Sequence, residues 1–147
     1  MFSPDSWDYA RPFTAEILVG QEHTDSLGHT NNIVYTQWCQ EIAWSHSTAL
    51  GMSAEDYTKL GRAMAIHHAE YKYLAAAMPG EQLLLATWIT ASDARVNMER
   101  RFQLRNAETG KTIFRGCWKL ACIRLDNGRP ARMPPEFLAV YEPAVVR

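Results

Sequence analysis

The sequence lacks several features that would assign it to a specialised class of protein. Fifteen Lys and Arg residues face 16 Asp and Glu residues, for a formal net charge of −1. No overall basic field therefore favours nucleic acid or an anionic membrane as a partner. No run of about 18 apolar residues is available to span a bilayer. The amino terminus has no cationic start followed by an apolar segment, so we expect no signal peptide.

Cysteine is scarce and follows no pairing pattern. Cys39, Cys117 and Cys122 are odd in number and form no C-x-x-C motif. We therefore expect free thiols in a soluble protein of the reducing cytoplasm. Histidine and acidic side chains do cluster between His23 and His29, but their spacing matches no established zinc pattern, so we expect no metal and no other cofactor.

The sequence does have enough apolar material for one core. Of its 147 residues, 47% are hydrophobic, and no internal repeat or low-complexity linker divides the chain. These values predict a single domain over residues 1–147, with a polar tail at 1–11 and a carboxyl-terminal extension at 133–147.

Hydrophobic periodicity predicts the order of helices and strands. Residues 12–20 have the composition of a strand that ends at a glycine. From about Asn31 to Leu50, apolar residues recur at steps of three and four, which predicts a helix of roughly five turns. Thr30 and Asn31 are both suitable amino-terminal caps, and Gly51 is a suitable stop. Further elements are expected as a short helix at 53–61, strands near 62–74, 81–92, 95–106 and 111–125, and a short helix or tail after 133.

Short, turn-rich links between these long strands predict an antiparallel meander. The element order predicts an α+β fold in which a five-stranded antiparallel sheet wraps around one long central helix. Residues 83–89 are apolar on both faces of their predicted strand. One helix cannot cover both faces, so we expect self-association, as a homodimer or homotetramer.

Reactive and hydrogen-bonding side chains crowd into the segment HTDSLGHTNNIVYTQW, which spans His23 to Trp38. A helix amino terminus carries unpaired N–H groups and a partial positive charge. The segment brings Asp25 to that terminus, and Gly28 permits a tight bend. Acyl transfer needs such a pairing of an oxyanion stabiliser with a nucleophile or base. In the alternative interpretation, the same side chains only cap the helix.

Asp25 to Trp38 resembles the D-x-x-G-H-x-N-N-x-x-Y-x-x-W signature of the hot-dog-fold thioesterases. The most similar groups are the 4-hydroxybenzoyl-CoA thioesterase family and the plant-type acyl-ACP thioesterases. Residues 67–89 also look like the second strand, Pro-Gly turn and third strand of that family. The resemblance implies a hot-dog fold that hydrolyses a fatty or aromatic acyl thioester of CoA or acyl-carrier protein to free acid and thiol.

The resemblance also implies roles for individual residues. Asp25 would be the nucleophile or general base, and the helix start at Asn32 would hold the thioester oxygen. His29 would assist. Three further positions would shape the loop and bind substrate: Gly28, Asn31 and Tyr35. Leu27 stands where the plant-type motif has asparagine, so the mechanism rests on Asp25.

Two other functions are consistent with such a fold. Enoyl-thioester hydratases pair Asp and His five residues apart in D-x-N-P-x-H, whereas Asp25 and His29 are four apart without proline. A non-catalytic acyl-thioester-binding protein is the other alternative, because a fold does not guarantee an activity.

Several side chains outside the motif invite a functional interpretation. Glu41 is expected on a solvated or interface surface of the long helix, and Trp44 is expected to contact a partner subunit. Arg100 falls among apolar residues of its strand, where a buried cation needs a partner. The remaining cations that could meet a CoA phosphate are Lys72, Arg101 and Arg105.

Overall fold

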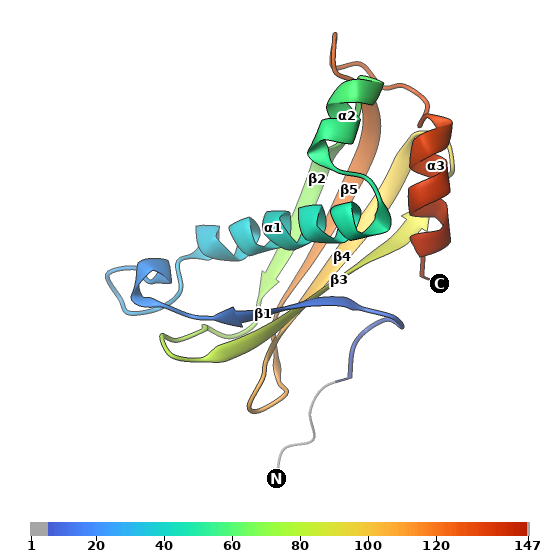
Figure 1. Ribbon diagram of the computed structural model, residues 1–147. Helices are drawn as coiled ribbons and strands as arrows, with labels where there is room; N and C mark the ends of the chain where they lie inside the picture. Colours follow the sequence, from blue (N-terminus) through green and yellow to red (C-terminus); the bar gives the residue numbers. More distant parts are fainter. Residues whose placement is uncertain (1–5, 147) are drawn as a thin grey trace.

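The computed structural model describes residues 6–146 and confirms the predicted order of elements. The elements are β1 (Phe13–Leu18), α1 (Asn32–Leu50), α2 (Ala54–Leu60), β2 (Arg62–Tyr73), β3 (Gln82–Ser92), β4 (Asn97–Asn106), β5 (Thr112–Arg124) and α3 (Pro135–Tyr141). Short 3-10 turns occupy Gln21–His23 and Glu142–Ala144. The sheet curves around α1, as Figure 1 shows.

Local signals set both ends of α1. The Asn31 side chain accepts a 3.1 Å hydrogen bond from the Ile33 N–H, so Asn31 is the cap. Thr30, the other predicted cap, instead donates its hydroxyl to the Ala77 carbonyl at 2.9 Å. Gly51 ends the helix at a φ of 110°, a left-handed conformation that glycine adopts without steric cost.

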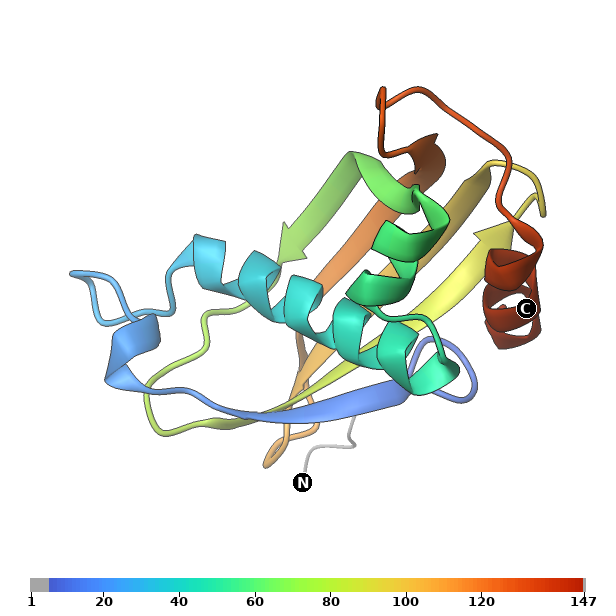
Figure 2. The ribbon, with the colours of Figure 1, turned by 45° about the horizontal axis from the view of Figure 1, so that its top comes forward.

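The strand order is β1-β3-β4-β5-β2, and every neighbouring pair is antiparallel. The predicted meander is therefore correct for β3, β4 and β5 but wrong for β2, which pairs with β5 instead of β3. The turn-rich link after β2 does not close a hairpin. Leu74 and Ala75 still donate to the Ile113 carbonyl, and the chain then passes below the start of α1 in Figure 2 to reach β3, which lies between β1 and β4.

The second face of β3 is covered by the chain itself. Trp88 is 1% exposed and meets the rings of Trp7 and Tyr9 edge-on, at centroid distances of 6.0 and 5.4 Å. Val146 completes this small cluster. Part of the segment expected as a polar tail thus packs on the sheet, and this face supplies no reason for self-association.

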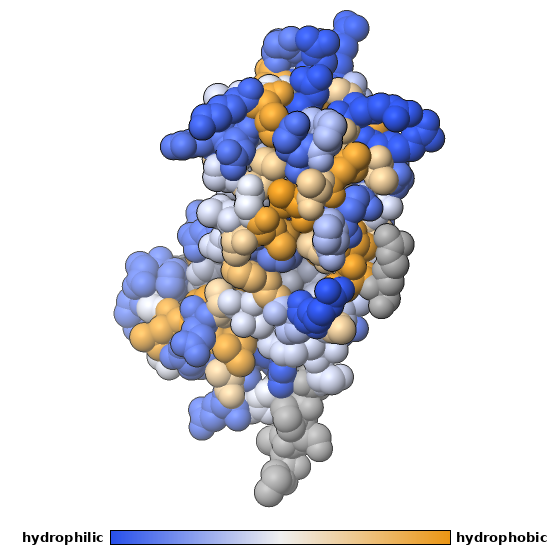
Figure 3. Space-filling model, turned by 45° about the vertical axis from the view of Figure 1, so that its right-hand side comes forward, coloured by the Kyte–Doolittle hydropathy of each residue, from blue (hydrophilic) through white to orange (hydrophobic). Residues whose placement is uncertain are grey.

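The two larger core clusters lie on the side of the sheet that faces α1. One groups α1 side chains such as Trp38 and Ile42 with Phe102 and Phe114 of the sheet. The other joins Phe137 of α3 to the sheet beyond the end of α1. On the side face drawn in Figure 3, apolar side chains gather toward the middle and hydrophilic ones dominate the upper end. Within residues 6–146, no helix is both long and apolar enough to cross a membrane.

Candidate active site

The loop before α1 is a closed turn that fixes the Asp25 carboxylate. The Asp25 carbonyl accepts a hydrogen bond from the Gly28 N–H at 3.1 Å, and the Asp25 N–H donates to the His29 carbonyl at 2.8 Å. Gly28 has a φ of 77°, which favours glycine. Asp25 Oδ1 accepts from the N–H groups of Leu27 at 2.9 Å and His29 at 3.3 Å. Oδ2 accepts no hydrogen bond from residues 6–146 and is therefore the oxygen open to chemistry.

The first turn of α1 leaves one backbone donor open. Asn31 accepts from Ile33 N–H through its side chain and from Val34 N–H through its carbonyl, at 3.1 and 2.9 Å. The Asn32 N–H donates to no residue of the described chain. It lies at the positive end of a 19-residue helix, where a developing negative charge is stabilised.

Hydrogen bonds tie this helix start to the link between β2 and β3. The N–H and the hydroxyl of Thr30 both donate to the Ala77 carbonyl, at 3.1 and 2.9 Å. The Ala77 N–H donates to the hydroxyl of Tyr35 at 3.0 Å. The Tyr35 ring is 3% exposed and stacks on Phe114 at 5.2 Å. Tyr35 therefore fixes the pocket wall and keeps its hydroxyl engaged with the backbone.

A cavity of about 310 Å³ lies at this junction. Its lining residues are Asp25, His29, Thr30, Asn32, Tyr35, Tyr73, Ala75 and Ala76. Four of the six predicted site residues thus share one cavity, whereas Gly28 and Asn31 shape the loop and the helix start without lining it. Tyr73, Ala75 and Ala76 were missed, because no local pattern reveals that a link some forty residues downstream passes this helix start.

Other polar residues near the motif have structural roles. His23 accepts the Gly20 N–H through Nδ1 at 3.0 Å, and its ring meets Trp38 edge-on. Glu41 is exposed and lies outside the cavity, as expected. No group of three or more His, Cys, Asp or Glu within residues 6–146 is placed to hold a metal ion.

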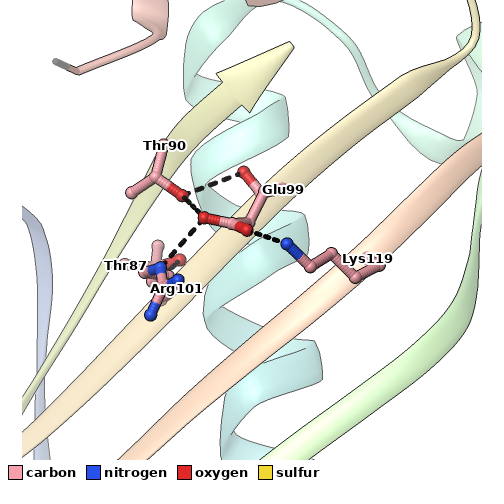
Figure 4. Close-up of polar contacts among 5 residues, drawn as sticks. All are labelled: Thr87, Thr90, Glu99, Arg101 and Lys119. Atoms are coloured by element: carbon pink, nitrogen blue, oxygen red, sulfur yellow. Dashed lines mark hydrogen bonds and ion pairs between the residues drawn. The ribbon is translucent and has the colours of Figure 1, made fainter.

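Two of the cations considered for CoA phosphates are engaged elsewhere. Arg101 donates to Glu99 at 2.9 Å, beside Thr90 and Lys119 (Figure 4). Although burial raises the pKa of the Glu99 carboxyl, these hydrogen bonds outweigh it and lower the pKa to about 2. Arg105 donates to the Gly110 carbonyl and lies 4.5 Å from the ring of Trp7. Lys72 is exposed, so its phosphate contact stays a prediction.

Arg100 and Trp44 do not belong to this cavity. Arg100 is 5% exposed, and its Nη1 donates to His46 Nδ1 at 2.9 Å and Thr87 Oγ1 at 3.1 Å. The buried cation therefore has polar partners, as expected, but no carboxylate among residues 6–146. Trp44 is 43% exposed and meets Tyr57 edge-on. Both residues line a second cavity between α1 and the sheet.

A five-stranded antiparallel sheet wrapped on one long helix is the architecture of the hot-dog class. Residues 19–140 match the family profile of the Thioesterase-like superfamily, and the chain belongs to this superfamily. It is 29% and 30% identical, over 129 residues, to the chloroplastic acyl-acyl carrier protein thioesterases ATL3 and ATL2 of Arabidopsis thaliana. The match covers 86% of this chain and spans 65% and 66% of those relatives.

Solved structures give the same fold. A 1,4-dihydroxy-2-naphthoyl-CoA thioesterase from Synechocystis is 26% identical, with a TM-score of 0.78 over 88% of this chain and 96% of that one. A 12:0-ACP thioesterase from Umbellularia californica has a TM-score of 0.83 at 17% identity, over 92% of this chain and 54% of that one. The second likeness supports the hot-dog fold alone.

Proposed function

We propose that this protein is a thioesterase that hydrolyses an acyl-CoA to a free acid and CoA. The observation that carries the proposal is the shared cavity of Asp25 and Asn32. Within residues 6–146, it combines a carboxylate oxygen that accepts no hydrogen bond with a helix-start N–H that has no acceptor. A thioester needs such a pair, because its carbonyl oxygen gains negative charge as the carbon is attacked.

In the proposed reaction, the thioester carbonyl oxygen accepts the Asn32 N–H. Asp25 Oδ2 then either attacks the carbonyl carbon or takes a proton from an attacking water. The carbon–sulfur bond breaks and the thiolate leaves without a strong acid, because thiols are acidic, with a pKa of about 8.5. Water supplies the hydroxyl of the acid and, through its proton, the hydrogen of the thiol. His29, at the rim of the same turn, assists this proton transfer.

CoA is the preferred carrier because the net charge of −1 provides no broad basic surface for an acidic carrier protein. The relatives differ in this respect, since some are named for acyl-carrier-protein thioesters and others for CoA thioesters. The acyl group would enter past Tyr73, Ala75 and Ala76, which line the cavity on the side of the β2–β3 link. We also propose that the enzyme acts in the cytoplasm.

We also propose a homodimer formed through β2. This strand lies at a free edge of the sheet, and unpaired strand edges readily pair with another chain. Ile66 and Tyr73 on this strand and Leu74 just beyond it are 43%, 45% and 53% exposed. Because Tyr73 also lines the Asp25 cavity, a second subunit on this edge would cover the site and exclude water from it.

A thiol-release assay over acyl-CoA substrates from acetyl to long-chain and aromatic groups tests the activity. Hydrolysis of at least one thioester, with matching free acid, supports the proposal. Binding without release across the whole series would replace it with the non-catalytic alternative. Release of a hydrated acyl thioester from an enoyl-CoA would replace it with a hydratase.

A further inference from the structure

A second cavity of about 310 Å³ lies farther along α1, between this helix, α2 and the sheet. It shares no lining residue with the Asp25 cavity. From Asn32 to Ala43, which lines it, α1 rises about 16 Å. Much of its wall is apolar and comes from Trp44, Met64, Met98 and Trp118. The volume and lining are those of a pocket for a small organic molecule.

The charge in this wall belongs to Arg100, a buried arginine. Burial lowers the pKa of Arg100 to about 10, so the guanidinium is still protonated at neutral pH. Burial, together with the neighbouring Arg100, lowers the pKa of His46 to about 4, so His46 is neutral there and its Nδ1 accepts the Nη1 hydrogen. Among residues 6–146, no Asp or Glu forms an ion pair with Arg100. The hydrogen-bonded pair of Arg100 and His46 therefore carries one net positive charge.

The tyrosines beside Arg100 do not neutralise it. Ser47 donates to the Met52 carbonyl at 2.6 Å, so Tyr141 donates to Ser47 and Tyr57 to Tyr141, each at 2.6 Å. Burial raises the pKa of both phenols, which stay protonated. Each hydroxyl hydrogen is thus used within the chain, and these residues offer the cavity neutral polar oxygen atoms.

The free donors of Arg100 have the geometry that a carboxylate matches. Both of its hydrogen bonds start from Nη1, and neither Nε nor Nη2 donates to residues 6–146. Nε and Nη2 form the edge with which Arg115 holds Asp8 and Arg124 holds Asp126 in this same protein. Arginine binds carboxylates through two parallel N–H bonds of this kind, and a buried charge without such a partner is costly.

We propose that this cavity binds an organic carboxylate, with the carboxylate on Nε and Nη2 of Arg100 and the apolar body against Trp44 and Trp118. The carboxylate belongs either to a free acid or to the far end of a dicarboxylic acyl group. The free-acid case is independent of the proposed function, whereas the acyl-group case rests on it.

Calorimetry of the full chain with octanoate, and with neutral octanamide, tests the binding. Octanoate should bind the wild type at least roughly thirtyfold more tightly than octanamide, and Arg100→Met should remove that difference. Arg95→Met, at an exposed arginine of the β3–β4 turn, should keep it. Because the octanoate-to-octanamide ratio is measured on the wild type, it decides the free-acid case even if Arg100→Met does not fold.

The acyl-group case is read from kcat/KM for hexadecanedioyl-CoA and hexadecanoyl-CoA, because an acyl group held at Asn32 must cross the about 16 Å to this cavity. A preference for hexadecanedioyl-CoA that disappears in Arg100→Met places the carboxylate on the acyl group, whereas tight octanoate binding places it on a free acid. The absence of both preferences in the wild type would overturn the proposal. If no CoA thioester is hydrolysed at all, the octanoate titration still decides whether the carboxylate site exists.

Discussion

The hydroxyl of Tyr35 accepts the backbone N–H of Ala77 at 3.0 Å, across 42 residues of sequence. This bond connects the second turn of α1 to the link that forms one wall of the Asp25 cavity. The helix start, the loop and the link are therefore one unit, held from inside the core.

Replacement of Tyr35 by Phe tests this connection. The buried Ala77 N–H would lose its acceptor, so we expect the free energy of unfolding to fall by about 1–3 kcal/mol and kcat/KM to fall with it. Urea unfolding and the thiol-release assay measure the two effects. The control is Tyr73→Phe, at a ring that is 45% exposed, which should change stability by less than about 0.5 kcal/mol. Equal stability of the two variants would contradict the role of the bond.

Asn31 caps α1 beside the proposed oxyanion donor, and two substitutions separate capping from chemistry. Asn31→Ala removes the acceptor of the Ile33 N–H and should lower the free energy of unfolding by about 1 kcal/mol. Asn31→Asp keeps an acceptor oxygen and should retain the stability of the wild type. Thermal unfolding of both proteins gives the comparison. An alanine variant as stable as the aspartate variant would argue against the cap.

The buried His46 predicts a loss of stability in mild acid. Its pKa is about 4 in the folded protein against about 6.5 when unfolded, so the unfolded chain binds the proton first. The contribution of neutral His46 to the free energy of unfolding is therefore complete above pH 6.5. It is lost as the pH drops toward 4, by roughly 3 kcal/mol in total. The carboxyl of Glu99, with a pKa of about 2, loses its contribution only at lower pH.

Urea unfolding between pH 7 and 4.5 measures this slope. His46→Gln should flatten it, whereas the same change at exposed His68 should leave it in place. A wild-type stability that is constant over this range would contradict the buried, neutral state of His46.

The proposed dimer predicts that a charge on the β2 edge separates the subunits. Leu74 is 53% exposed just beyond β2, and Leu74→Glu should yield a monomer by light scattering with reduced kcat/KM. Leu18→Glu is the matched control, because Leu18 is 62% exposed on β1 at the opposite edge. A wild-type monomer, or a Leu74→Glu dimer of unchanged stability, would rule out this interface.

Local patterns predicted the elements well and their pairing less well. The span of α1 follows from its apolar spacing, from the Asn31 cap and from Gly51, all of which are readable in sequence. The position of β2 does not follow, because a turn-rich link is compatible with a hairpin and with a crossover. Pairings between distant strands decide between them. In the structure β1 and β4 occupy both edges of β3, and β2 pairs with β5.

The candidate site divides in the same way. Asp25, His29 and Asn32 lie within eight residues, and a family resemblance identifies them together. Tyr73 and Ala76 reach the cavity only through the path of the β2–β3 link. The cover of Trp88 by Trp7 and Tyr9 was missed because two aromatic residues in a short polar segment are too few to mark it as packed.

The central claim is that Asp25 performs the chemistry, and kcat/KM of Asp25→Asn measures it most directly. With an acyl-CoA that the wild type hydrolyses, we expect a loss of at least about 100-fold in a folded protein. Glu41→Gln, at an exposed acid on α1 outside the cavity, should keep the wild-type value. An Asp25→Asn protein within about threefold of the wild type would contradict the account.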